Sequence, residues 1–178
     1  MAGPSPDAKR TAWLGLGGNV GDVAAAMAGV LQALDGRADT DVAAVSGLYR
    51  TPPWGVTDQP DFLNCCAGIR TALAPDALLD ACLTLEREWL RERQMRWGPR
   101  TIDIDILAHD GPPVDAPGLT IPHPRASERA FVLLPLAEIA PDLRLAGRRV
   151  ADLVRDADRS GMTRLDLPAD WWRGGSTD

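Results

Sequence analysis

Hydrophobic residues recur along this chain with two alternating periods, which predict strands and helices in turn. Segment 13–16 lies among glycines and predicts a first strand that runs into a glycine turn at 17–21. Asp22 is expected to cap the next helix and Gly36 to end it, because the apolar residues between them recur at helical spacing. The chain therefore opens with a strand, a tight turn and an amphipathic helix.

The middle of the chain continues this alternation and predicts the fold class. Segments 42–51, 62–71 and 101–108 are β-like, and a helix opens at Pro75 before the last of them. The order β-α-β-β-α-β predicts an α+β, ferredoxin-like sandwich with an antiparallel sheet. Additional C-terminal elements follow, including a helical stretch at 131–139.

Length and composition fit one compact domain. The chain has 178 residues, of which 45% are hydrophobic and 25% charged, as in ordinary globular proteins. We place the domain at residues 11–167 and expect flexible tails at 1–10 and 173–178. Trp171 and Trp172, just before the second tail, are expected to dock on the domain.

Charge and cysteine content narrow the class of function. A net charge of −6 argues against a protein that neutralises nucleic-acid phosphates, and no stretch is long and apolar enough to cross a bilayer. Cys65, Cys66 and Cys82 lack metal-binding spacing and are expected to be reduced core residues. We therefore expect a cytoplasmic protein with neither nucleic-acid nor membrane partners.

The strongest chemical signal is a pair of aspartates within segment 96–107. Residues two apart on a strand share a face, so Asp103 and Asp105 project together while the isoleucines around them point into the core. Paired carboxylates suit Mg²⁺, which takes substrate phosphates and waters as further ligands. The opposite charge that a polyphosphate needs comes from four upstream arginines: Arg91, Arg93, Arg96 and Arg100. The alternative is a surface strand beside a salt-bridged helix end.

Three weaker signals accompany the aspartates. Phe62 and Asn64 share one face of their predicted strand, and an aromatic plane beside an amide suits a flat heterocycle. His123 lies between two prolines, and together with the following Arg125 and Arg129 it could hold phosphate oxygens. Glu86 lies on the apolar side of its helix, either at the rim of the core or facing a site.

The common nucleotide-binding motifs are absent from the sequence. The only lysine, Lys9, belongs to no G-x-x-x-x-G-K-[ST] pattern, and neither H-R-D nor D-F-G occurs. The glycines at 15–18 lead to Val20, where the dinucleotide fingerprint requires glycine. A nucleotide site in this chain must therefore be built differently.

Segment 96–107, Arg-Trp-Gly-Pro-Arg-Thr-Ile-Asp-Ile-Asp-Ile-Leu, resembles the signature of the 6-hydroxymethyl-7,8-dihydropterin pyrophosphokinase family. The resemblance covers about residues 12–155, with supporting segments at 16–22, 49–55, 59–64 and 121–123, and Phe131. It implies an enzyme of folate biosynthesis that transfers pyrophosphate from ATP to the pterin alcohol and releases AMP.

The resemblance also implies roles for individual residues. Asp103 and Asp105 would hold two Mg²⁺ ions, beside the catalytic Arg93 and Arg100. The residues implied to bind ATP are Glu86, Arg93, Arg96, Arg100, Ile106, His123 and Arg129. The residues implied to line the pterin pocket are Thr51, Pro52, Trp54, Phe62, Asn64, Trp97 and Phe131, with Phe62 and Phe131 on either side of the ring. A monomer is expected.

Three departures from the family pattern affect the expected ATP contacts and loop closure: Gly-Gly-Asn at 17–19, Gln94 and Pro124. Three other classes of protein are alternatives to this enzyme family. A non-catalytic α+β ligand-binding module would need no paired aspartates, and a single-stranded RNA binder would need basic charge and exposed aromatics on adjacent strands. A metal-dependent nuclease would leave Phe62 and Asn64 unexplained.

Overall fold

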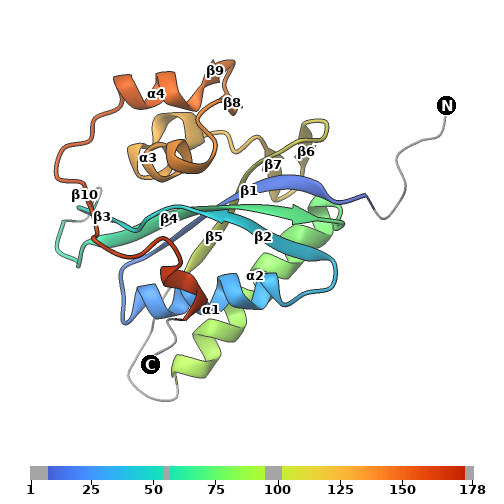
Figure 1. Ribbon diagram of the computed structural model, residues 1–178, viewed down its shortest axis with the longest axis horizontal. Helices are drawn as coiled ribbons and strands as arrows, with labels where there is room; N and C mark the ends of the chain where they lie inside the picture. The colour runs from blue at the N-terminus through green and yellow to red at the C-terminus, as the bar shows by residue number, and fades with distance from the viewer. Residues whose placement is uncertain (1–7, 54–56, 95–101, 175–178) are drawn as a thin grey trace.

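The protein consists of an antiparallel sheet with helices packed on both of its faces (Figure 1). The structure, a computed structural model, describes residues 8–53, 57–94 and 102–174. The sheet has the strand order β10-β3-β4-β1-β5, and β2 also pairs with β4. Its strands are β1 (Arg10–Gly18), β2 (Thr40–Val45), β3 (Tyr49–Thr51), β4 (Phe62–Thr71), β5 (Asp103–His109) and β10 (Thr163–Arg164). The predicted α+β class with an antiparallel sheet is confirmed.

The helices divide between the two faces of the sheet. In Figure 1, α1 and α2 lie below the sheet, and α3 and α4 lie above it. The helices are α1 (Val23–Asp35), α2 (Pro75–Gln94), α3 (Ala130–Ile139) and α4 (Val150–Asp156), with short 3₁₀ turns at Ala126–Glu128 and Trp171–Arg173. Two small hairpins complete the fold, β6 (Val114–Ala116) with β7 (Leu119–Ile121) and β8 (Arg144–Leu145) with β9 (Arg148–Arg149). None of the described helices has the length and apolar character needed to span a membrane.

The central strand β4 is buried on both faces because each face packs against its own layer of helices. Cys65 and Ile69 point to one face of β4 and belong to the core between the sheet and the helices α1 and α2. Cys66 faces the other way into the core under α3 and α4, and its Sγ donates to Val132 O at 3.6 Å. All three cysteines are buried and unpaired, as expected, and Cys82 lies on α2.

The structure confirms the predicted start and end of the first helix and corrects the bounds of several predicted strands. Asp22 caps α1 by accepting a hydrogen bond from Ala25 N at 3.0 Å, and Gly36 ends the helix. The predicted strand 42–51 is divided between β2 and β3, because the Ser46 hydroxyl replaces a main-chain partner and accepts from Cys66 N at 2.9 Å. Arg10, expected in the flexible tail, is the first residue of β1.

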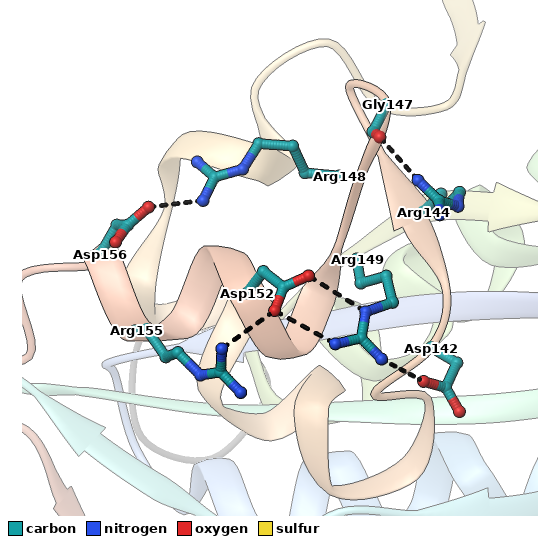
Figure 2. A network of polar contacts seen from close by, with 8 residues as sticks. All are labelled: Asp142, Arg144, Gly147, Arg148, Arg149, Asp152, Arg155 and Asp156. Atoms are coloured by element: carbon teal, nitrogen blue, oxygen red, sulfur yellow. Dashed lines mark hydrogen bonds and ion pairs between the residues drawn. The ribbon is translucent and has the colours of Figure 1, made fainter.

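The C-terminal third adds elements that the sequence pattern did not predict. The β8–β9 hairpin and α4 lie over α3, and Figure 2 shows Asp152 of α4 between Arg149 and Arg155. Trp172 is 4% exposed in the core beside α1, and Trp171 Nε1 donates to Ser46 O at 3.0 Å. The docking predicted for the two tryptophans is therefore confirmed.

Replacing Gly29 by alanine is expected to destabilise the protein by about 1–3 kcal/mol, as overpacked core substitutions do. Gly29 lies where α1 meets α2, and a Cβ there would stand 1.9 Å from Trp89 Cζ2. Chemical denaturation measures the free energy of unfolding. A gain in stability, which the helix propensity of alanine alone would give, would contradict this contact. Combining Gly29→Ala with Trp89→Leu should recover part of the loss.

Candidate functional site

One end of the sheet brings the predicted site residues onto a single face. In the strand ladders Asp103 lies opposite Gly17, and Gly17 lies opposite Asn64. Asp105 likewise lies opposite Gly15. Directly paired residues of antiparallel strands share a face of the sheet, so both aspartates lie on the same face as Asn64. We call this surface the site face and define it by Asp103, Asp105, Phe62 and Asn64.

Glycines on the central strand β1 keep the middle of the site face free of side chains. A Cβ on Gly17 would come 2.7 Å from Asn64 Oδ1, and one on Gly15 would come 3.3 Å from Leu107 Cδ2. A larger residue at position 17 would therefore displace the Asn64 amide. The glycines at 15 and 17 alternate as the aspartates at 103 and 105 do, a signal that the sequence analysis did not connect with the site.

The two aspartates have the exposure that their alternation predicted. Asp103 and Asp105 are exposed, whereas Ile104 and Ile106 are each 5% exposed in the core. Although its side chain is exposed, partial desolvation of the carboxyl group, followed by repulsion from Asp105, raises the pKa of Asp103. Neither aspartate forms an ion pair with another described residue. Two adjacent carboxylates that no described basic residue pairs with form a place where a cation would bind favourably.

Glu86 and His123 form hydrogen bonds with main-chain groups on the outer edge of β5. Glu86 Oε1 accepts from Ile104 N at 2.7 Å, and His123 N donates to Leu107 O at 2.8 Å. Burial raises the pKa of Glu86, and the hydrogen bond from Ile104 acts in the opposite direction. Glu86 thus supports the strand that carries the aspartates, while its contact with ATP stays a prediction.

His123, Arg129 and Phe131 lie where β7 leads into α3. The Nδ1 atom of His123 accepts from Arg125 N at 3.2 Å, which leaves Nε2 as the donor of the neutral ring. Burial is the main cause of the lowered pKa of His123; the charge of Asp105 acts in the opposite direction, and the charges of Arg129 and Arg125 add to the lowering. The Arg129 guanidinium lies 5.6 Å from the centre of the Phe131 ring, within cation–π range. A neutral donor and a guanidinium are therefore available to phosphate oxygens.

Asn64 and Thr51 form a buried polar pair beside Phe62. The two residues are 6% and 5% exposed, and Asn64 Nδ2 donates to Thr51 Oγ1 at 2.9 Å. Thr51 lies opposite Phe62 in the ladder of β3 and β4, and Phe62 is half-buried. The hydrogen bond fixes the plane of the Asn64 amide next to an aromatic ring, which is the arrangement expected for a heterocycle site.

The described ends of loop 52–61 are each in contact with another segment. Asn19, in the turn after β1, donates to Gln59 Oε1 at 2.9 Å and to Pro60 O at 3.2 Å. At the other end, a Cβ on Gly161 would come 3.2 Å from Pro52 Cγ. These contacts place both ends of the loop beside the site face.

Several predicted residues are not placed on the site face. Trp54, Arg96, Trp97 and Arg100 lie outside the described residues. Arg93 lies in the last turn of α2, and its phosphate contact stays a prediction. The Ile106 side chain points into the core under α1 and α2, so only its main chain could contact ATP.

Two further features limit what the site can be. A cavity of about 470 Å³ lies at the opposite end of the sheet, lined by residues such as Arg10, Thr71, Leu78 and His109. It contains none of the predicted polar site residues, so the site face remains the candidate functional site. Within the ranges that the structure describes, no group of three or more His, Cys, Asp or Glu residues could hold a metal ion. Any cation there would share its ligands with a substrate.

Comparison with known proteins gives consistent sequence matches. The profile of the 7,8-dihydro-6-hydroxymethylpterin-pyrophosphokinase (HPPK) family matches residues 13–141. A 2-amino-4-hydroxy-6-hydroxymethyldihydropteridine pyrophosphokinase of Methylorubrum extorquens is 50% identical over 155 residues, which cover 87% of this chain and 98% of that protein. The protein of the same name from Pseudomonas aeruginosa is 43% identical over 154 residues, covering 86% of this chain and 95% of that protein.

Solved structures share the fold. A crystal structure of an HPPK-DHPS in complex with substrates aligns with a TM-score of 0.72 at 13% identity, over 90% of this chain and 47% of that chain. Wild-type HPPK-DHPS of Plasmodium falciparum aligns with a TM-score of 0.63 at 14% identity, over 83% of this chain and 44% of that chain. This chain thus spans a little under half of those longer chains, and at such identities the likeness shows the fold alone.

Proposed function

Because this chain belongs to the 7,8-dihydro-6-hydroxymethylpterin-pyrophosphokinase family, we propose that the site face binds both of its substrates. The protein transfers pyrophosphate from ATP to 6-hydroxymethyl-7,8-dihydropterin in folate biosynthesis. The observation that supports this placement is the row Asp103, Gly17, Asn64 across three strands. It puts a paired carboxylate and an oriented amide about 10 Å apart on one face, with no side chain on the strand between them.

Asp103 and Asp105 are the residues that would hold Mg²⁺. Both are exposed oxygen donors on one face, and Mg²⁺ prefers such ligands while keeping water and phosphate as the others. A shared site of this kind needs no third protein ligand. When bound, the metal would neutralise the charge that develops on the triphosphate oxygens. We propose two ions at these aspartates.

The part of the site face around Phe62 and Asn64 would bind the pterin. Phe62 and Phe131 would contact the two sides of the ring, and Asn64 would hydrogen-bond its edge. Since Thr51 already accepts from Asn64 Nδ2, the amide presents a fixed pattern of donor and acceptor. Pro52, Trp54 and Trp97 complete the proposed pterin contacts.

The phosphates of ATP would lie between the aspartates and the basic residues. Neutral His123 would donate from Nε2, and Arg129 would contribute a charged, two-point donor. The other proposed ATP contacts are Glu86, Arg93, Arg96, Arg100 and Ile106.

In the chemical step, the pterin hydroxymethyl oxygen would attack the β-phosphorus of ATP in line. A bond from that oxygen to the β-phosphorus forms while the bond from the β-phosphorus to the bridging α,β oxygen breaks. AMP leaves with the bridging oxygen, and the proton of the alcohol passes to solvent. We assign the acceleration to positioning, to arginine charge and to the charge that Mg²⁺ held by Asp103 and Asp105 would supply, rather than to a dedicated general base.

Removal of Mg²⁺ tests the nucleotide part of this proposal. Calorimetry with α,β-methylene-ATP should show an affinity about 100-fold lower in excess EDTA than in Mg²⁺, because metal-held charge contributes several kcal/mol. Asp103→Asn should show the same low affinity even with Mg²⁺. Asp115→Asn, at an exposed aspartate of β6, is the matched control and should bind as the wild type does. Equal binding with and without the metal would move the nucleotide away from the aspartates.

We further propose that the enzyme acts as a monomer in the cytoplasm. The three unpaired, buried thiols are compatible with a reducing compartment.

A further inference from the structure

The carboxylate of Glu138, near the end of α3, connects three separate segments of the chain. Gly47 N donates to Oε2 at 3.0 Å, and the Tyr49 hydroxyl donates to Oε1. Arg164 of β10 donates from Nε to Oε1 at 2.8 Å and from Nη2 to Oε2 at 3.4 Å. Four donors fill the hydrogen-bonding capacity of a carboxylate. The Glu138 side chain is only 28% exposed, so this cluster differs from a solvated surface pair.

The surroundings favour the protonation states that these contacts need. Burial raises the pKa of Glu138, but the hydrogen bonds from Arg164, Tyr49 and Gly47 outweigh it and lower the pKa. Burial, together with the charge of Glu138, raises the pKa of Tyr49 to about 12. Near neutral pH Glu138 is therefore charged and Tyr49 keeps the proton that it donates.

Through Tyr49, the Glu138 cluster reaches the strand that orients the amide of the site. Tyr49 lies opposite Asn64 in the ladder of β3 and β4. Two residues later on β3, Thr51 accepts the hydrogen bond that fixes Asn64. A shift of β3 relative to β4 would therefore change the orientation of the amide.

Through its own helix, Glu138 also reaches the aromatic residue on the other side of the proposed pterin site. Phe131 and Glu138 are seven residues apart on α3, two turns along the same helix face and about 10 Å apart along the axis. Near Phe131, the helix contacts β4 through Val132 O and the Cys66 thiol. Near its other end, Glu138 contacts β3. The position of α3 over the sheet is thus set at both ends.

We propose that Glu138 is a positioning residue for the pterin site, which together with Arg164 holds α3 against β3 and so fixes Phe131 and Asn64 relative to each other. This inference rests on the proposed pterin site. Arg164 belongs to β10, which pairs with β3 through Tyr49 and lies beyond the residues matched by the family profile. Gly47 makes room for it, because a Cβ there would come 2.7 Å from the Arg164 guanidinium. The C-terminal strand β10 therefore belongs to the same set of contacts that holds α3 against β3.

Steady-state kinetics of Glu138→Gln and Arg164→Met provide the test. Each variant removes the charge pair, and the pterin KM should rise about tenfold because coupled contacts of this type typically change binding by such factors. The KM for ATP and kcat should stay within about twofold of the wild type. The double variant should show no larger effect than either single variant, since both remove the same contact. A role in stability alone would lower the melting temperature and leave the ratio of the two KM values unchanged.

Asp152→Asn is the matched control. Asp152 accepts from Arg149 Nε at 3.0 Å and from Arg155 Nη1 at 3.3 Å, and its side chain is 33% exposed (Figure 2). Loss of this cluster on α4 should leave the pterin KM unchanged.

A second control, Phe131→Ala, tests the site itself. If Phe131→Ala raises the pterin KM but Glu138→Gln and Arg164→Met leave it within twofold, the positioning inference is wrong and the site stands. If Phe131→Ala also has no effect, the pterin site is misplaced.

Discussion

Replacement of Asp105 by asparagine should lower kcat by about two to four orders of magnitude while leaving the protein folded. The substitution keeps the shape of the side chain but removes one of two carboxylates that face the proposed triphosphate site. Its effect on stability should be neutral or favourable, because the charge of Asp105 acts against ionisation of Asp103 in the folded protein. AMP release from ATP, Mg²⁺ and 6-hydroxymethyl-7,8-dihydropterin measures the loss.

Thermal unfolding provides the control for this variant. In the wild type, Mg²⁺ with α,β-methylene-ATP should raise the melting temperature by mass action, since the ligand binds only the folded state. The same mixture should have little effect on Asp105→Asn. Near-normal AMP release by a folded Asp105→Asn protein would exclude a metal-binding role for this aspartate.

Replacement of Phe62 by alanine should weaken pterin binding by roughly fivefold to 150-fold and leave ATP binding unchanged. Stacking of a base-like ring on an aromatic side chain contributes about 1–3 kcal/mol. Phe62 is only half-buried at the start of β4, so its truncation removes little from either core. Calorimetric titration of the variant with each substrate separately measures both affinities.

The matched variant Phe62→Tyr keeps the ring and should bind the pterin within about threefold of the wild type. Equal weakening of both ligands by Phe62→Ala would show that the residue supports the fold of the site rather than stacking on the pterin.

Much of the site face could be predicted because period-two alternation determines which residues share a face. On β5, the alternation of isoleucine and aspartate placed Asp103 and Asp105 together and the isoleucines in the core, and the structure confirms both. On β4, the same reasoning put Phe62 and Asn64 on one face. The meeting of these two pairs across β1 depends on strand register, which is a long-range property that neither segment encodes alone.

The missed features share a physical cause, which is the absence of a local periodic signal. The donors to Glu138 lie 26 to 91 residues away in the chain, so nothing near Glu138 marks it as a connecting residue. The elements α4, β8, β9 and β10 are short and carry many exposed charges, so their apolar residues form no extended pattern. The tight approach of Gly29 to Trp89 likewise depends on how two helices pack.

Main-chain groups on the outer edge of β5 already have hydrogen-bond partners, and this affects how copies of this protein behave in concentrated solution. A border strand with free main-chain amides and carbonyls is a template for strand addition, the first step of many aggregation reactions. Here a glutamate oxygen already accepts from Ile104 N, and the main chain of His123 already donates to Leu107 O. The opposite border consists of β10, which is only two residues long, and of β2, whose Val42 N donates to Asp35 Oδ1 at 2.9 Å. Between Ile104 and Leu107 the β5 border therefore offers a neighbouring molecule no continuous row of unpaired groups, which disfavours strand addition at that border.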